Sequence, residues 1–200
     1  YYMTTGSISM VDAGAAAPLV RFAVPSAAIF FLLFIGFAVK LPVFPLHTWL
    51  PDAHTDAPTA VSVMLAGVLI KMGGYGIIRI CVSIFPEVAR QYAPLLIALG
   101  VISVIYGAAV TLRQTDLKRL IAYSSVSHMG YVLLGVFALS TASLTGASLQ
   151  MFSHGIVTGL LFAMVGLVYE KTHVRHLERL GGLARQMPIV AVVFSIAGLA

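Results

Sequence analysis

The stretch APTAVSVMLAGVLIKMGGYGIIRICVSI, residues 57–84, decides the fold of this chain. It is apolar over almost its whole length and is longer than the roughly 20 residues that a helix needs to cross a bilayer. Lys71 lies about halfway along it. At about 1.5 Å per residue, its ammonium is on the order of 15–20 Å from either helix end, which is further than a lysine side chain can reach. We therefore predict a membrane-spanning helix in which Lys71 faces the interior of a helix bundle, water or a counter-charge.

The neighbours of Lys71 favour an interior position. Gly67, Gly74 and Tyr75 share its helix face at i−4, i+3 and i+4, and the glycines let another helix or water approach. An ammonium at this depth costs at least ~2.5–3.5 kcal/mol on insertion scales. One interpretation is a static buried ion pair. We favour a lysine that handles protons, because ionisable residues inside membranes generally mark a transport path.

The composition of the whole chain agrees with a membrane protein. Of its 200 residues, 60% are hydrophobic and 10% are charged, whereas a soluble domain carries about 25% charged residues. A net charge of +5 could indicate nucleic-acid binding, but the basic residues lie at the ends of apolar runs instead of on one soluble face. A single cysteine, Cys81, cannot form an intrachain disulfide or ligate an iron–sulfur cluster. No glycine-rich nucleotide-binding motif is present, so redox chemistry must belong to a partner chain.

The apolar runs predict an all-α, polytopic transmembrane bundle. We expect an extracytoplasmic segment over residues 1–21 and one transmembrane module over 22–200, both parts of a longer protein. The module should hold five spans and the start of a sixth. We place them at 22–39 and, after a break, on toward residue 50; then at 57–84, 94–112, 117–139 and 147–169; and from 188 onward.

The charges between the spans predict the orientation. Lys and Arg residues gather in two connections, around Arg113 and around Arg175, whereas residues 140–145 carry none and 86–93 carry only Arg90. The positive-inside rule therefore puts the Arg113 and Arg175 loops in the cytoplasm.

Local signals should mark the helix ends. We expect Asp56 to cap the span that begins near Pro58, and Thr115 or Asp116 to cap the span near Leu117. Trp49 is expected at the membrane interface.

Lys40 precedes a predicted helix break. Pro42 and Pro45 each remove a backbone donor, so the freed carbonyls should line protein or a cavity and not lipid. A helix that ends near Lys40 points its negative end at the ammonium, as at the ion sites of transporters with broken helices. The alternative is a lysine that reaches the membrane interface, because the first span is long enough to end there.

Two histidines lie inside predicted spans. His128 shares a helix face with Ser124 and Tyr131, which makes a polar stripe suited to a water chain, and Ser127 lies next to it. His154 has Thr158 at i+4. For each histidine, a proton relay and an ordinary helix-packing hydrogen bond remain open.

Other polar clusters have simpler interpretations. His47, Asp52, His54 and Asp56 could hold a metal, but no ligand spacing is matched, and a solvated turn is the favoured interpretation. His173, His176 and Glu178 are expected in a solvated loop. Gly155 and Gly159 form a GxxxG pattern that should permit close helix packing.

Several long motifs resemble, in the same order, the antiporter-like membrane subunits of respiratory complex I, and most of all the subunit 4 or M-type branch. The resemblance covers residues 22–200. Its motifs are KLPVFPLHTWLPDAH (40–54), APTAVSVMLAGVLIKMGGYG (57–76), DLKRLIAYSSVSHMGY (116–131), MFSHG (151–155), YEKTH (169–173) and the glycine pair at 181–182.

The resemblance implies a fourteen-helix subunit of which this chain is helices seven to eleven and part of twelve. Lys40 would match the lysine of broken helix seven, Lys71 that of helix eight, and His128 and His154 the histidines of helices ten and eleven. The glutamate that the family pairs with the helix-seven lysine, and a further ionisable residue on helix twelve, would lie elsewhere in the protein.

The function implied is proton translocation as a non-redox subunit of NADH:quinone oxidoreductase. This chain would hold no cofactor; NADH, flavin, iron–sulfur clusters and quinone would bind partner subunits. Its contacts would be other membrane subunits of complex I, lipid, protons and internal water, with no nucleic acid. Two alternatives remain: a subunit of a Na⁺/H⁺ antiporter or membrane-bound hydrogenase complex, and a purely structural membrane subunit.

Overall fold

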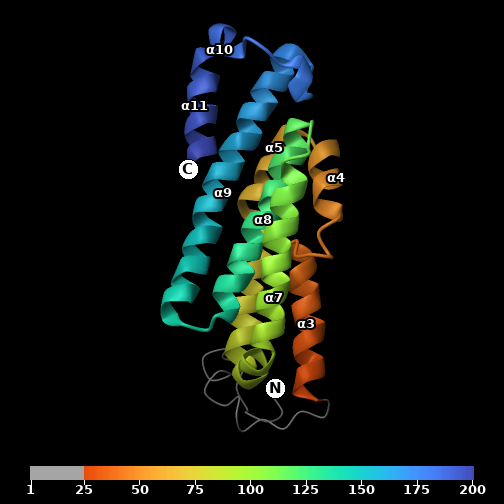
Figure 1. Ribbon diagram of the computed structural model, residues 1–200, viewed down its shortest axis with the longest axis vertical. Helices are drawn as coiled ribbons and strands as arrows, with labels where there is room; N and C mark the ends of the chain where they lie inside the picture. The colour runs from red at the N-terminus through yellow and green to blue at the C-terminus, as the bar shows by residue number, and fades with distance from the viewer. Residues whose placement is uncertain (1–24) are drawn as a thin grey trace.

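The computed structural model describes residues 25–200, and the segment predicted over 1–21 lies outside them. The described chain is a bundle of long helices that run up and down side by side (Figure 1). Four helical stretches are long and apolar enough to cross a membrane, and two shorter apolar helices accompany them. The predicted all-α bundle is therefore confirmed. The four are Thr59–Val82, Pro86–Thr111, Leu117–Phe137 and Thr141–Thr172.

The first predicted span is broken as expected. Helix α3 (Ser26–Lys40) ends at the lysine, and α4 (Trp49–Asp56) continues in the same direction after a stretch of turns (Figure 1). The Trp49 indole N–H donates to the Val39 carbonyl at 2.9 Å, and the Phe44 N–H donates to Ser103 Oγ at 3.1 Å. These bonds give two backbone groups near the break partners within the chain, as backbone freed from a helix requires in a bilayer. The Trp49 side chain thus links the start of α4 to the end of α3 across the break.

The second span contains two turns of π-helix. It runs through α5 (Thr59–Met64), η2 (Leu65–Leu69), α6 (Ile70–Gly76) and η3 (Ile77–Val82). The expected cap at Asp56 is wrong, because that residue ends α4, and Pro58 precedes α5 without a side-chain cap. Short π-helical turns inside a helix often mark functional sites. Here they lie immediately before and after the segment that carries Lys71.

Two later helices begin earlier than predicted. Helix α7 (Pro86–Thr111) starts at Pro86 and not at 94, because proline is tolerated in a first helical turn and Val88 and Ala89 on the added turns are buried. Helix α9 (Thr141–Thr172) starts at Thr141 and not at 147, because Ser140 and Ser143 form a reciprocal capping box. The uncharged connection predicted over 140–145 is therefore mostly helix.

Helix α8 (Leu117–Phe137) begins as predicted. The Asp116 carboxylate accepts the backbone N–H groups of Lys118 and Arg119, at 2.8 and 3.2 Å. Helix α11 (Pro188–Leu199) packs along α9, and the short η4 (Leu177–Arg179) and α10 (Leu183–Gln186) connect the two.

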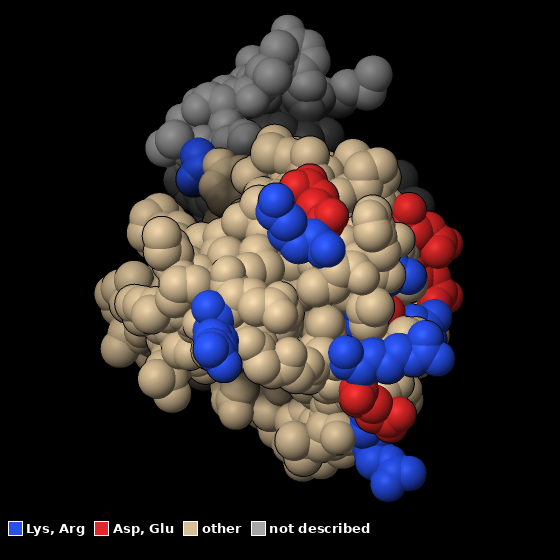
Figure 2. Space-filling view, turned by 90° about the horizontal axis from the view of Figure 1, so that it is seen from above, with Lys and Arg blue, Asp and Glu red and all other residues tan. Residues whose placement is uncertain are grey.

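The surface of the bundle is that of a membrane protein. Large apolar side chains such as Leu32, Ile105 and Phe152 are more than 60% exposed. Seen from above, most of the surface is uncharged, and basic and acidic side chains gather toward one side of this end (Figure 2).

Candidate functional site

Lys71 points into the bundle, toward α9. Its Nζ lies 2.8 Å from His154 Nδ1 and also donates to the Ala66 carbonyl one turn back. The ammonium therefore has two polar contacts at mid-span, and neither is with lipid. A charged lysine at this depth needs a polar partner inside the protein, and His154 and the Ala66 carbonyl are such partners.

Two glycines make this contact geometrically possible. A Cβ added to Gly155 would lie 2.8 Å from the Gly67 carbonyl oxygen and 3.6 Å from Lys71 Cε. The backbones of α9 and η2 therefore touch at this level, so that Lys71 can reach the histidine beside Gly155. The next glycine of the GxxxG pattern, Gly159, approaches Val63 less closely, at 3.7 Å for an added Cβ. The predicted close packing is confirmed.

The two predicted histidines lie next to each other. The ring centroids of His154 and His128 are 5.2 Å apart, and Gln150 Nε2 lies 3.1 Å from His128 Nδ1. His154 is 5% exposed, and its Nε2 has no hydrogen-bond partner among residues 25–200. The structure thus brings Lys71, His154 and His128 together from three helices, and one ring nitrogen of His154 is without a partner within the described residues.

The polar residues predicted to form one stripe around His128 have different partners in the structure. The ring of Tyr131 is 6.3 Å from that of His128, on the same open face of α8. Ser124 instead donates back to Ile121 in its own helix. Ser127 is buried on another face, where its hydroxyl donates to the Val104 carbonyl of α7 at 3.0 Å. The structure therefore places Tyr131 with the histidines and places Ser127 in the packing of α7 against α8.

Lys40 lies apart from this row. It is half-buried at the end of α3, and its ammonium has no hydrogen bond or ion pair with residues 25–200. The end of α3 at Lys40 and Leu41, just before the prolines, packs directly on the second span. A Cβ on Gly73 would lie 2.6 Å from Leu41 N and 2.7 Å from Phe37 O. Sequence reasoning missed Gly73, although its place two residues after Lys71 in a glycine pair was a visible signal.

The solvated turn predicted for His47 and His54 is wrong. The two side chains are 2% and 0% exposed, and all four ring nitrogens lack hydrogen-bond partners within the described residues. His54 stacks on Phe162 with ring centroids 4.3 Å apart, and His47 lies against Tyr106 at 5.0 Å. The reason for His54 is that α4 folds into the bundle, so its inward face is buried. His47 lies in the turns before α4, where Phe44 and Tyr106 enclose its ring.

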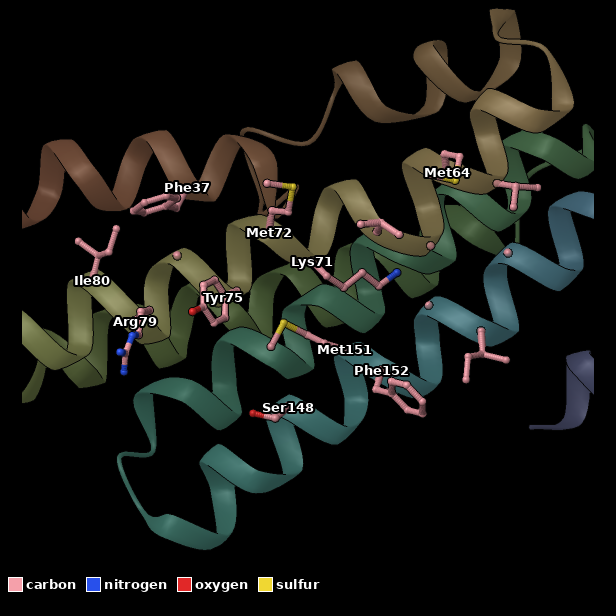
Figure 3. Close-up of a pocket in the computed structure, with 17 residues that line it drawn as sticks. Phe37, Met64, Lys71, Met72, Tyr75, Arg79, Ile80, Ser148, Met151 and Phe152 are labelled. Atoms are coloured by element: carbon pink, nitrogen blue, oxygen red, sulfur yellow. The ribbon is translucent and has the colours of Figure 1, made fainter. Parts of the chain in front are cut away.

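A groove opens beside Lys71, between the second span and α9. Its volume is about 880 Å³, and its lining is mostly apolar, with Lys71 and Arg79 as the charged members (Figure 3). No group of three or more His, Cys, Asp or Glu residues that could hold a metal occurs in residues 25–200.

The fold and the site define a class: a polytopic α-helical membrane protein with a broken span and a row of ionisable groups between its helices. Within that class, residues 1–200 match the transmembrane family described as NADH:quinone oxidoreductase/Mrp antiporter, and the chain belongs to this family. The membership expected from the motifs is confirmed.

Individual relatives agree. The chain is 49% identical over 167 residues to NADH-quinone oxidoreductase subunit M of Rickettsia conorii, an alignment that covers 84% of this chain and 34% of that protein. It resembles a chain of respiratory complex I from Thermus thermophilus with a TM-score of 0.82 and 32% identity, over 98% of this chain and 45% of that one. A chain of the Mrp complex from Dietzia sp. matches with a TM-score of 0.86 and 29% identity, over 98% and 36%. The sequence thus spans about a third of the relative's length.

Proposed function

We propose that this chain is the proton-translocating part of a subunit M of an NADH:quinone oxidoreductase. The observation that carries the proposal is the contact between Lys71 Nζ and His154 Nδ1, 2.8 Å apart and in the middle of the bundle. The name of the Rickettsia relative and the likeness to a chain of complex I supply the context. The protein would lie in a bacterial inner membrane with the Arg113 and Arg175 loops in the cytoplasm, as the charge distribution favours.

Proton transfer would proceed along the row of ionisable groups. Protonated Lys71 donates to His154 Nδ1, and His154 then releases a proton from its unpaired Nε2 toward His128. With their ring centroids 5.2 Å apart, the two imidazoles are near enough for a direct transfer once a ring nitrogen of each faces the other. Gln150 orients the His128 ring, and Tyr131 extends the polar face beyond it.

Lys40 would connect this row to events elsewhere. It ends α3 immediately before the break, and the backbone at Lys40 and Leu41 is packed on the second span at Gly73. Coulomb interactions through a bundle interior are stronger than in water, so a change in the charge paired with Lys40 would alter proton transfer at Lys71. NADH, flavin, iron–sulfur clusters and quinone would be bound by partner subunits and supply the driving event.

The test is a Lys71→Met variant of the whole complex in sealed vesicles. We expect NADH-driven acidification to fall at least about tenfold per NADH oxidised, as for loss of a proton-transfer group. The matched control is Lys171→Met, which removes an exposed lysine at the end of α9. Full pumping by Lys71→Met would contradict the proposal and favour a purely structural subunit.

The second candidate function is that of a subunit in a sodium-linked antiporter. The observation that favours it is the TM-score of 0.86 to a chain of an Mrp complex. It predicts that the complex exchanges Na⁺ for H⁺ across vesicles without NADH. Neighbouring genes for flavin and iron–sulfur subunits would favour the oxidoreductase, and neighbours encoding small antiporter subunits would favour the antiporter.

A further inference from the structure

Two cations hold the C-terminal end of α4. The Lys118 ammonium donates to the Ala57 carbonyl at 2.7 Å, and the Arg175 guanidinium donates to the Thr55 carbonyl at 2.9 Å. The last carbonyls of a helix have no partner within it and carry partial negative charge. Lysine and arginine are therefore well suited to this position, and here they come from α8 and from the loop after α9.

The cations are themselves held in place. Arg175 Nε lies 3.5 Å from a carboxylate oxygen of Asp116, and the guanidinium lies 5.5 Å above the Tyr169 ring. The Arg175 carbonyl also accepts the Leu117 N–H at 3.1 Å, which ties its loop to the start of α8. Lys118 is only 5% exposed. We call Asp116, Lys118 and Arg175 the cation clamp.

The clamp acts on a helix that the break has separated from α3. At its other end, α4 is attached through Trp49, whose indole donates to Val39. Between these attachments, His54 packs on Phe162 of α9. The position of α4 therefore sets where the break lies relative to the helix that carries His154. By contrast, the ion pair between Arg119 and Asp52 is exposed and contributes little.

We infer that Lys118 and Arg175 are positioning residues for proton transfer: by capping α4 they keep the second half of the broken span fixed between α8 and α9. The clamp spans three segments that are far apart in the sequence, and charged side chains gather at this end of the molecule (Figure 2). The effect on pumping rests on the proposed function, whereas the effect on α4 does not.

The experiment measures both effects in the complete complex. Spin labels at Asp56→Cys and Arg113→Cys, both exposed positions, report the distance from the end of α4 to the α7–α8 connection. Arg175→Gln should increase the displaced population of α4 about tenfold, because a hydrogen bond to a charged group is lost. It should also lower pumping per NADH severalfold. Arg175→Lys keeps a cation and should restore part of both.

Controls separate the clamp from general charge effects and from misfolding. Arg179→Gln removes the same charge from an exposed arginine nearby and should change neither distance nor pumping. If Arg175→Gln does not assemble, Asp116→Asn keeps the cap of α8 but weakens the hold on Arg175, and it should shift both readouts in the same direction.

The outcomes are distinct. An unchanged distance distribution in Arg175→Gln, or a broadened one with unchanged pumping, overturns the positioning role. Normal pumping by Lys71→Met instead overturns the proposed function. The distance measurement would still show whether Lys118 and Arg175 hold α4 in place.

Discussion

Lys71 shows how a charge is accommodated at mid-membrane. Its ammonium has the Ala66 carbonyl and His154 as partners, and the groove beside it is otherwise almost entirely apolar. A buried amine is costly unless it is hydrogen-bonded, so the histidine stabilises it, and under the proposed function it also accepts the lysine's proton.

A double-variant cycle tests this contact. Lys71→Met and His154→Leu should each lower pumping at least about tenfold, and the double variant should be no worse than the poorer single variant, because the two residues serve one transfer. The measurement is the initial rate of vesicle acidification at matched rates of NADH oxidation. Independent, multiplying losses would contradict a direct transfer between Lys71 and His154.

At the scale of elements, the site depends on how closely α9 approaches the second span. The approach occurs at the level of the π-helical segment η2, where Gly67 and Gly155 put the two backbones in contact. In membranes, where water does not drive helices together, such small residues let van der Waals contact hold them. The contact places His154 in reach of Lys71.

Gly155→Ala should therefore separate the two helices. The new Cβ would meet the Gly67 carbonyl at 2.8 Å, and backbone cannot move aside cheaply, so we expect a loss of about 1–3 kcal/mol and weaker pumping. Gly146→Ala on the same helix meets nothing within 4 Å and should leave both unchanged. Thermal denaturation of the purified complex gives the comparison, and equal stability of the two variants would refute the packing argument.

The whole molecule has one end with most of its basic connections. The connection after α7 and the loop after α9 lie at the same end of the bundle, and α9 begins at the opposite end (Figure 1). The clamp holds these loops together, which keeps the charged end compact. This agrees with the sidedness expected from the sequence.

Cysteine labelling tests the orientation. A membrane-impermeant maleimide should modify Arg113→Cys in inside-out vesicles and Thr141→Cys in intact right-side-out membranes, since both positions are exposed and lie at opposite ends. Disruption of the membrane, which should make both positions reactive, is the control. The reverse pattern would contradict a cytoplasmic location for the Arg113 and Arg175 loops.

The sequence by itself determined the membrane bundle, the break after Lys40 and the depth of Lys71. These are local properties: apolar length, missing backbone donors and the reach of one side chain can be read without knowing which helices touch. The motifs likewise sufficed for the family.

Only the tertiary structure decided the partners. That His154 meets Lys71, that His47 and His54 are buried, and that Lys118 caps α4 all depend on which helices pack together and at what rotation. Such contacts join residues far apart in the chain: 83 positions separate Lys71 from His154, and 120 separate Thr55 from Arg175. Their geometry is set by close backbone approaches, such as the one at Gly67 and Gly155, which follow from the packing of the whole bundle.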